Sequence, residues 1–285
     1  MQNNIDVKTK GEIVRRTGQK EGLVQTLREI WAYRQMIVSF VRRDLRGRYK
    51  GSVLGFLWTF INPLLQLLVY TIVFSAILNS TIEEYYLHLF VALIPWIFFS
   101  SSVLGGSVSI LAQKDMVKKI YFPREVLPIF TVTSNFINML LCFIVVIAVV
   151  LFSGRIPHPL GLLCLVPVFA VEYILALGMA LFVSAVTVYL RDMEHILGII
   201  MMAWQYLTPV LYNIDSINDK MIRFVFSLNP MSSIITAYRD ILYWCKIPDA
   251  STMMSLLWAF ILGSVVLVVG WFTFSRLKRR FAEEL

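Results

Sequence analysis

The sequence is poor in charged residues and in the residue types that bind metals. Only 15% of its 285 residues are charged and 58% are hydrophobic, which is too apolar for a soluble domain of this length. The three cysteines, Cys142, Cys164 and Cys245, are far apart and form no CxxC pair, which argues against a disulfide framework and a zinc site. The three histidines are isolated and no HExxH spacing occurs, so the sequence predicts no metal centre.

Motifs of enzymes that bind nucleotides or activate a nucleophile are also missing from the sequence. There is no phosphate loop of the form GxxxxGK[ST], no GxSxG turn and no cluster of carboxylates near the end of an apolar segment. Arg191 and Asp192 form a lone charged pair in a short link. A membrane transferase needs acidic clusters to hold its metal and to activate a hydroxyl. The sequence therefore predicts no catalytic residue and no cofactor on this chain.

Long apolar runs make up most of the sequence. A membrane-spanning helix needs about 20 apolar residues to cross a hydrocarbon core of about 30 Å. Six segments are candidates, of which only the fifth is short: residues 53–78, 86–111, 126–152, 160–189, 196–212 and 253–274. The sequence therefore predicts an all-α integral membrane protein with six transmembrane helices. Residues 1–52 form a basic arm, and residues 53–285 form the membrane domain.

The positive charges are distributed unevenly between the two sides of the predicted spans. Lys and Arg residues near span ends are retained on the cytoplasmic side. If the N-terminus is cytoplasmic, 21 of the 26 Lys and Arg residues lie on that side and 5 lie on the other. Both termini are therefore predicted to be cytoplasmic. This topology accounts for the net charge of +8, so nucleic acid is not an expected partner.

Apolar residues recur at three- and four-residue spacing in the arm, over residues 23–45. Arginines are interleaved with them, most densely at Arg42, Arg43, Arg46 and Arg48. An apolar stripe flanked by arginines predicts an amphipathic helix over residues 21–50 that lies in the cytoplasmic interface. Gly47 and Gly51 would allow a bend into the first span. A soluble N-terminal tail is the alternative.

Two short connecting segments also have helical patterns. In the basic link between the second and third spans, residues 114–121 are long enough for two helical turns before Pro123 ends them, although an ordinary loop fits equally well. Residues 213–252 contain two apolar runs separated by Asn229 and Pro230, each too short to cross a membrane. We predict a re-entrant helical hairpin in the outer leaflet. Two amphipathic helices lying flat on the outer surface are the alternative.

Glu172 is the only acidic residue in the predicted spans, which makes it a functional candidate. Its place near the outer end of the fourth span predicts that it snorkels or pairs at the interface, in a structural or pore-lining role.

Five aromatic residues lie too deep for the interfacial belts. We interpret them as candidates for a sugar pathway, although apolar packing is the commoner role: Trp96, Phe98, Phe99, Trp204 and Tyr206.

Six stretches of the sequence, in their order, resemble the permease subunits of ABC-2 type exporters, especially those for bacterial surface polysaccharides. They are RRDLRGRYKGSVLGFLWTFINPL (42–64), IPWIFFSSSV (94–103), KDMVKKIYFPREVLP (114–128), YLRDMEHI (189–196), YLTPVLY (206–212) and SLNPM (227–231). The resemblance covers the chain from about residue 25 to its end. It is closest to permeases for wall teichoic acid, and capsule and O-antigen permeases are also similar.

The resemblance implies a homodimer in the bacterial plasma membrane, surrounded by membrane lipid and carried by two copies of a separate ATPase that binds ATP and Mg. Its substrate would be an undecaprenyl-diphosphate-linked polymer. The arginines of residues 42–48 would attract its anionic head first, and its glycosyl units would then pass the deep aromatics. The coupling helix that docks into the ATPase would be Lys114, Asp115, Met116, Val117, Lys118, Lys119, Ile120 and Tyr121. The outer gate would be the hairpin of residues 215–244, with Phe224, Asn229, Pro230 and Tyr238.

An ion-coupled carrier or channel is the alternative of a different class. Such a protein places charged or hydroxyl-rich sites at mid-membrane on broken helices. In the predicted spans only Glu172 fits this pattern. The sequence therefore favours an ATP-driven exporter over an ion-coupled carrier.

Overall fold

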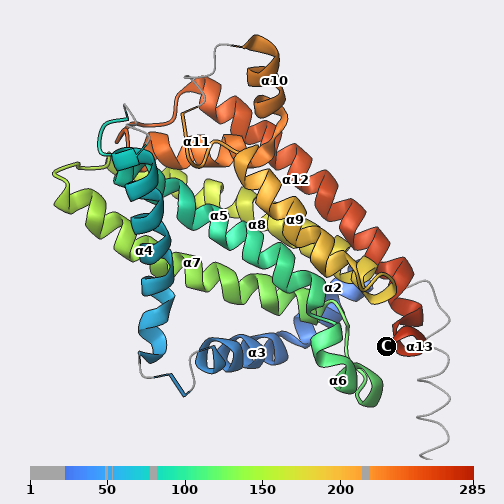
Figure 1. Cartoon of the computed structure of the whole chain (residues 1–285). Helices are drawn as coiled ribbons and strands as arrows, with labels where there is room; N and C mark the ends of the chain where they lie inside the picture. Colours follow the sequence, from blue (N-terminus) through green and yellow to red (C-terminus); the bar gives the residue numbers. More distant parts are fainter. Residues whose placement is uncertain (1–22, 49–50, 53, 78–81, 214–218) are drawn as a thin grey trace, which may run out of the picture.

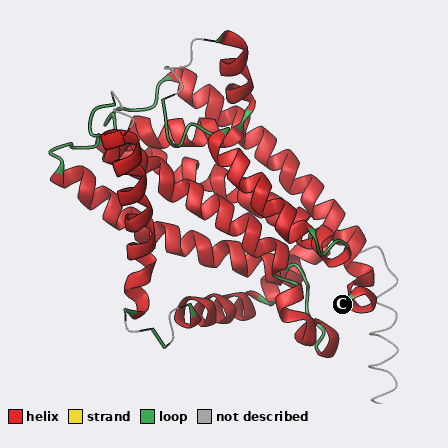
Figure 2. Ribbon diagram, in the orientation of Figure 1, coloured by secondary structure: helices red, strands yellow, loops and turns green. Residues whose placement is uncertain are grey.

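The computed structural model of the chain describes residues 23–48, 51–52, 54–77, 82–213 and 219–285, and all regular secondary structure in these ranges is helical (Figure 2). The expectation of an all-α protein is thus confirmed. In chain order the elements are α2 (Leu23–Ala32), α3 (Arg34–Gly47), η1 (Gly55–Leu57), α4 (Trp58–Thr71), η2 (Ile72–Ile77), α5 (Tyr85–Val108), η3 (Leu111–Gln113), α6 (Lys114–Lys119), α7 (Val126–Phe152), α8 (Pro159–Tyr189), α9 (Met193–Tyr206), α10 (Lys220–Leu228), α11 (Pro230–Leu242), α12 (Ala250–Leu277), η5 (Lys278–Arg280) and α13 (Phe281–Glu284).

Long helices form a bundle whose two ends carry different short helices (Figure 1). The elements α3, α6 and α13 lie at one end, which we name the α6 end, and α10 and α11 lie at the other, the α10 end. Within the described residues, five helices are long and apolar enough to cross a membrane: Gly55–Ser75, Tyr85–Val108, Val126–Phe152, Pro159–Tyr189 and Ala250–Arg280. They correspond to the first four predicted spans and the sixth. Of the predicted first span, residues 53 and 78 lie outside the described residues.

The predicted fifth span, residues 196–212, is not one long helix. Its helix, α9, has 14 residues and is about 21 Å long, which is less than the hydrocarbon thickness of about 30 Å. Residues 207–212 form turns instead. Pro209 explains part of this difference, because the residue before a proline disfavours the helical conformation. A sixth span is therefore not confirmed.

The helix α8 packs against α5 and α12 at very short distances. An ideal Cβ built on Gly178 would lie 2.6 Å from the backbone nitrogen of Leu267 in α12. A Cβ on Gly106 of α5 would lie 2.7 Å from the Cβ of Ala180. The backbones approach this closely because glycine leaves no side chain between them, as is common where membrane helices cross.

The helix α4 is attached to the bundle more loosely than α5. Its buried residues are Thr59 and Pro63. Its exposed apolar residues include Leu65, Leu68 and Val69. Most of its apolar surface is therefore free of contacts with the described residues of the same chain.

The predicted amphipathic helix over residues 21–50 is interrupted, contrary to the expectation of one helix. The break lies at Tyr33, which leaves the helical region with φ −89° and ψ 13°. The second part, α3, lies against α7, and the rings of Phe40 and Phe130 are 5.2 Å apart. The bend toward α4 lies at Gly51, whose φ of 88° favours glycine, whereas Gly47 is the last residue of α3. Residues 1–22 and 49–50 of the arm lie outside the described residues, and its interfacial position stays a prediction.

The structure also refines the two short helical segments. In the predicted coupling helix, α6 ends at Lys119, because Ile120 adopts an extended conformation with φ −126° and ψ 136°. At the α10 end, Asn229 separates α10 from α11 as predicted. Almost all of α11 is buried against α5, α8 and α12, whereas α10 projects from the bundle (Figure 1). The re-entrant position of this pair stays a prediction, and residues 215–218 lie outside the described residues.

Candidate functional site

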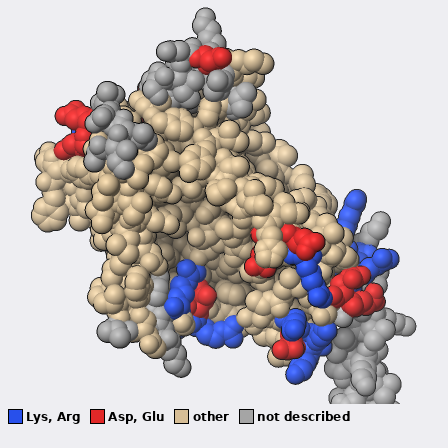
Figure 3. Space-filling view, viewed as in Figure 1, with Lys and Arg blue, Asp and Glu red and all other residues tan. Residues whose placement is uncertain are grey.

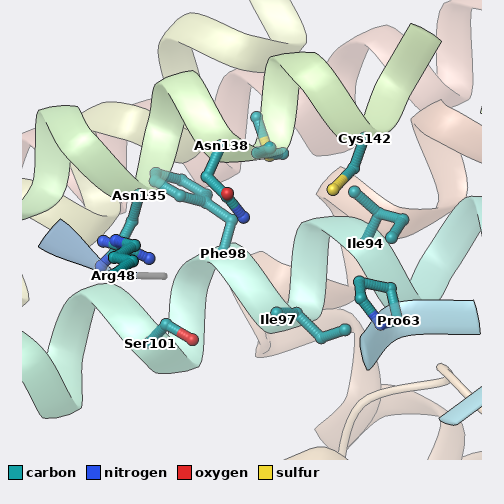
Figure 4. Close-up of a pocket in the computed structure, with 10 residues that line it drawn as sticks. Arg48, Pro63, Ile94, Ile97, Phe98, Ser101, Asn135, Asn138 and Cys142 are labelled. Atoms are coloured by element: carbon teal, nitrogen blue, oxygen red, sulfur yellow. The ribbon is translucent and has the colours of Figure 1, made fainter. Parts of the chain in front are cut away.

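A cleft lies between α4, α5 and α7, with Arg48 at one end and Cys142 at the other (Figure 4). It is small: about 40 Å³ of it can be reached by the centre of a water molecule, and all space between its lining atoms, open solvent included, amounts to about 310 Å³. One arginine, three polar side chains and several apolar side chains line it: Arg48, Pro63, Ile94, Ile97, Phe98, Ser101, Asn135, Asn138, Met139 and Cys142. A lining that is mostly apolar with a few polar groups suits an amphiphilic ligand.

Arg48 is held at the cleft by side chains of α3 and α7. Its Nε donates to Oδ2 of Asp44, one turn earlier, at 2.9 Å. Its Nη2 donates to Oδ1 of Asn135 at 2.6 Å and to the hydroxyl of Ser134 at 3.4 Å. Ser134 in turn donates to the Asp44 carboxylate. The guanidinium is therefore fixed on α7 while the residue remains exposed.

Two buried polar atoms close to the cleft lack hydrogen-bond partners in the described part of the chain, Oδ1 of Asn138 and Oγ1 of Thr59. Asn138 points from α7 toward α5 in Figure 4. The carbonyl oxygen of Thr59 accepts a hydrogen bond from Cys142, which lines the cleft, at 3.5 Å. An unsatisfied buried polar group costs about 1–3 kcal/mol. A hydrogen-bond donor of a ligand in the cleft would therefore be stabilised by Oδ1 of Asn138, which lines the cleft.

Of the four arginines predicted to meet an anionic head group, only Arg48 lines the cleft. Arg42, Arg43 and Arg46 are exposed on α3. The Arg43 guanidinium lies 4.8 Å from the centre of the Phe40 ring. The sequence located this group of arginines, but their packing on α7 decides which of them reaches the cleft.

The five predicted pathway aromatics lie in three different surroundings. Trp96, Phe99 and Trp204 form a buried contact between α5 and α9, in which Phe99 lies 5.9 Å from Trp96 and 5.3 Å from Trp204. Phe98 lines the cleft. Tyr206 is 58% exposed at the end of α9. Within one chain they form no continuous wall, and their role in a pathway stays a prediction.

The predicted coupling segment has one buried residue and an exposed mixed surface. Val117 is buried in a cluster at the α6 end, whereas Ile120 and Tyr121 are 59% and 65% exposed. The charged residues of α6, Lys114, Asp115, Lys118 and Lys119, are exposed around this apolar pair, and Met116 is half-buried. Apolar residues with a charged rim are typical of protein interfaces. This surface is therefore suited to docking a partner.

The C-terminal segment packs onto the residues that follow α6, which the sequence did not predict. Lys278 forms an ion pair with the buried Glu125 at 2.7 Å, and Arg124 donates to the Lys278 carbonyl. The Phe281 ring is fully buried, and the Arg124 guanidinium lies 5.8 Å from its centre. Burial lowers the pKa of Arg124. The end of the chain thus fixes the start of α7 relative to α12.

Glu172 is fully buried, so the expectation that it snorkels is wrong. Its Oε2 accepts a hydrogen bond from the Tyr238 hydroxyl at 2.6 Å, which agrees with the expectation that it pairs. Its Oε1 has no partner in the described residues. The physical reason for its burial is that α11 covers this part of α8. The pair connects two helices, and a pore-lining role stays a prediction.

Asn229 joins the end of α9 to the start of α11. Its Oδ1 accepts from the backbone nitrogen of Met231 at 3.0 Å, which caps α11, and from the Trp204 indole at 3.1 Å. Its Nδ2 donates to the Leu207 carbonyl at 3.1 Å and to the Thr208 hydroxyl at 2.9 Å. The predicted gate residue is therefore a junction between two helices. Pro230 is the first residue of α11, whereas Phe224 is exposed on α10.

Arg239 is a candidate that the sequence analysis missed. It is only 6% exposed, and in the described residues no carboxylate forms an ion pair with it. Its guanidinium donates to the carbonyl oxygens of Val210 at 2.8 Å, Tyr212 at 3.3 Å and His88 at 3.4 Å. Its position within the apolar face of residues 234–242 could have revealed it, because a cation on such a face needs a buried partner.

Two aspartates fix the start of α12 next to α11. Asp249 accepts from the backbone nitrogen of Thr252 at 2.8 Å, and this hydrogen bond lowers the pKa of Asp249. Asp240 of α11 accepts from the Thr252 hydroxyl at 2.7 Å, and burial raises its pKa. One threonine therefore connects the two helices and helps to begin the second.

Comparison with known proteins identifies a family for this architecture. Residues 35–243 match the family model described as ABC-2 type transporter. The chain is 35% identical over 268 residues to the O-antigen export system permease protein RfbA of Myxococcus xanthus. The aligned region makes up 92% of this chain and 100% of that protein. An RfbA of Klebsiella pneumoniae is 32% identical over 251 residues, 88% of this chain and 95% of that protein.

A third relative, the polysialic acid transport protein KpsM of Escherichia coli, is 23% identical over 204 residues, 70% of this chain and 77% of that protein. The family match extends from α3 to the end of α11 and includes the cleft, α6 and the junction at Asn229. Together with the five long apolar helices, these relatives identify a multi-pass membrane protein. The chain belongs to the ABC-2 type transporter family.

Proposed function

We propose that the chain is the permease subunit of an ATP-driven exporter that moves a lipid-linked surface polysaccharide of the O-antigen type out of the bacterial cytoplasm. The observation that carries this proposal is the similarity to O-antigen export permeases over almost the whole chain. The prediction of wall teichoic acid gains no support from these relatives, which fit the O-antigen alternative. An ion-coupled carrier would need a charged group within its long helices to bind the ion. Glu172 is the one acidic residue in these helices, and it accepts a hydrogen bond from Tyr238, which favours an exporter over an ion-coupled carrier.

The charge distribution supports an orientation in the plasma membrane. In Figure 3 most Lys and Arg side chains gather at the α6 end, over α3, α6 and the C-terminal helices. Basic residues next to membrane spans are retained on the cytoplasmic side. In this proposal the α6 end faces the cytoplasm, the side predicted for both termini, and the α10 end faces outward.

The cleft is the proposed contact site for the lipid-linked head of the substrate. A diphosphate accepts charge-assisted hydrogen bonds from a guanidinium, and Arg48 is held at the cytoplasmic end of the cleft by Asp44 and Asn135. The polar atoms of Ser101 and Asn138 and the apolar wall fit an amphiphile that carries both a polar head and a lipid chain. The exposed arginines of α3 would raise the local concentration of the anionic head.

Energy for export would come from a separate ATPase that binds ATP and Mg. The sequence contains no phosphate loop, and the surface formed by α6, Ile120 and Tyr121 suits a docking partner. Two permease chains and two ATPase chains would form the working complex, with a pathway between the permeases.

The proposal is tested by deleting the chain in its host and following the polymer. Loss of the permease should leave lipid-linked polysaccharide inside the cell and remove it from the surface, measured by immunoblotting of intact and lysed cells. The matched control keeps the permease and replaces the phosphate-loop lysine of the partner ATPase, which should give the same phenotype. Normal surface polysaccharide in either strain would refute the proposed function.

A further inference from the structure

The stretch that follows α9, residues 207–212, is irregular backbone that is exposed at Leu207 and buried over residues 208–211. Thr208 and Val210 are fully buried, and Leu211 is 3% exposed. Buried carbonyl groups need hydrogen-bond partners because they have lost their contact with water. Irregular backbone at membrane depth occurs only where the surrounding protein or a water-filled cavity supplies these partners.

Side chains of neighbouring helices supply most of the partners in this stretch. Four of its carbonyl oxygens accept from three side chains: Leu207 from Asn229, Leu211 from Tyr85, and Val210 and Tyr212 from Arg239. Of these three donors, Arg239 belongs to α11 and Asn229 is the residue that caps the start of α11. They are ten residues apart, which is about 15 Å along a helix. The stretch is therefore attached to α11 at two separate points.

Arginine suits this position for geometric and electrostatic reasons. Its planar guanidinium has five N–H donors, so Arg239 holds two carbonyls of the stretch and a third, that of His88, in α5. The C-terminal end of a helix carries a partial negative charge, and the stretch begins where α9 ends. This partial charge and the carbonyl dipoles stabilise a buried cation that has no carboxylate partner in the described residues.

We infer that Arg239 is a positioning residue for export: its buried guanidinium holds residues 207–212 between α11 and α5, so that α9 and α11 stay attached while substrate passes. The inference rests on the proposed function for its link to export. The attachment itself is a property of the fold and is measured separately. Loss of Arg239 frees the stretch from α11 at one of the two points and leaves Asn229 as the other.

The test uses the accessibility of a cysteine at position 211 in the purified permease–ATPase complex. The native cysteines, Cys142, Cys164 and Cys245, are first replaced by alanine, and Leu211→Cys is introduced. A membrane-impermeant maleimide then reports how often the stretch opens. With Arg239 intact, labelling should be slow both at rest and during ATP turnover. Turnover that accelerates labelling more than about tenfold would show that the stretch is itself a moving hinge, and would overturn the inference.

Substitutions of Arg239 are compared with a matched arginine at the same end of the bundle. Arg239→Met should accelerate labelling at least about tenfold. Arg239→Lys should have a smaller effect, because its ammonium keeps the charge and some N–H donors but lacks the planar array of donors of a guanidinium. Arg155→Met removes an arginine that pairs with Glu84 at 2.7 Å outside this stretch, and should leave labelling unchanged. If the Arg239→Met complex does not assemble, the labelling rates of Arg239→Lys and Asn229→Ala are compared with the rate of Arg155→Met instead. Equal labelling in these variants and in the control would overturn the inference.

Export provides the second readout. The Arg239→Met complex should hydrolyse ATP yet export about tenfold less polymer per ATP, with partial rescue by Arg239→Lys. Unchanged polymer export per ATP would contradict a positioning role. If the unsubstituted complex fails to export the polysaccharide, the proposed function is wrong, and the labelling result still decides whether Arg239 holds the stretch.

Discussion

The close crossing of α8 and α12 offers a sharp test of the packing. Gly178→Ala would place a Cβ 2.6 Å from the Leu267 backbone nitrogen, whereas ordinary contacts begin at about 3.4 Å, so the two backbones must separate by roughly 1 Å. A gap of that size forfeits up to about half of the dispersion attraction along the contact. Overpacking typically costs about 1–3 kcal/mol, and we expect the upper end because backbone atoms, unlike side-chain ends, do not rotate away.

The assay is thermal unfolding of the purified complex in detergent. At about 2–4 °C per kcal/mol for a chain of this size, Gly178→Ala should lower the apparent melting temperature by roughly 6–12 °C. Gly198→Ala on α9 is the matched control, since no atom of the described residues lies within 4 Å of its Cβ position. This control should be neutral or gain up to about 1 kcal/mol from alanine's higher helix propensity. Melting temperatures within 2 °C of each other, roughly the error of such a scan, would refute the close crossing.

Three further predictions concern the site. Arg48→Glu should abolish substrate-stimulated ATP hydrolysis in an intact complex, and Arg46→Glu on the same helix should act more weakly; equal effects would contradict the role of the cleft. Tyr121→Asp should weaken ATPase binding by about 2 kcal/mol, roughly 30-fold, and retained co-purification at limiting concentration would place the interface elsewhere. Tyr238→Phe should destabilise the complex by about 1–3 kcal/mol because Glu172 loses its donor, whereas Glu172→Gln keeps an acceptor and should cost less; thermal unfolding showing the reverse order would disprove this.

The length of the apolar runs was sufficient to locate five long helices. The predicted bounds of α7 are those of the structure, because a polar or turn-forming segment flanks it on both sides. The run of residues 196–212 was misleading, because apolar composition does not distinguish a helix from buried turns. Its carbonyls are satisfied by Asn229, Tyr85 and Arg239, which are far away in the sequence. Such partners follow from the fold and not from the local pattern.

The candidate site was predictable as a group of residue types but not as an arrangement. The spacing of arginines located the region around Arg48, and its contact with Asn135 depends on how α3 packs against α7. The sequence identified Glu172 as an acidic residue in a long helix. Its burial depends on α11, whose Tyr238 is 66 positions away from it in the sequence. The contact of Lys278 with Glu125 spans 153 positions. Sequence patterns of a few residues do not report contacts at such separations.

The packing of α8 indicates which part of the chain is free to move. α8 has 31 residues and is about 46 Å long, and it contacts α12 and α5 through glycine positions that leave no room for sliding. Its Tyr189 donates to the Leu277 carbonyl at 2.9 Å near one end, and Glu172 binds Tyr238 in its other half. By contrast, α4 is buried only at Thr59 and Pro63. Because Arg48 is held on α7, movement of α4 would widen the cleft between Pro63 and α7 without moving the guanidinium. A substrate head could then stay bound at Arg48 while the apolar wall opens beside it.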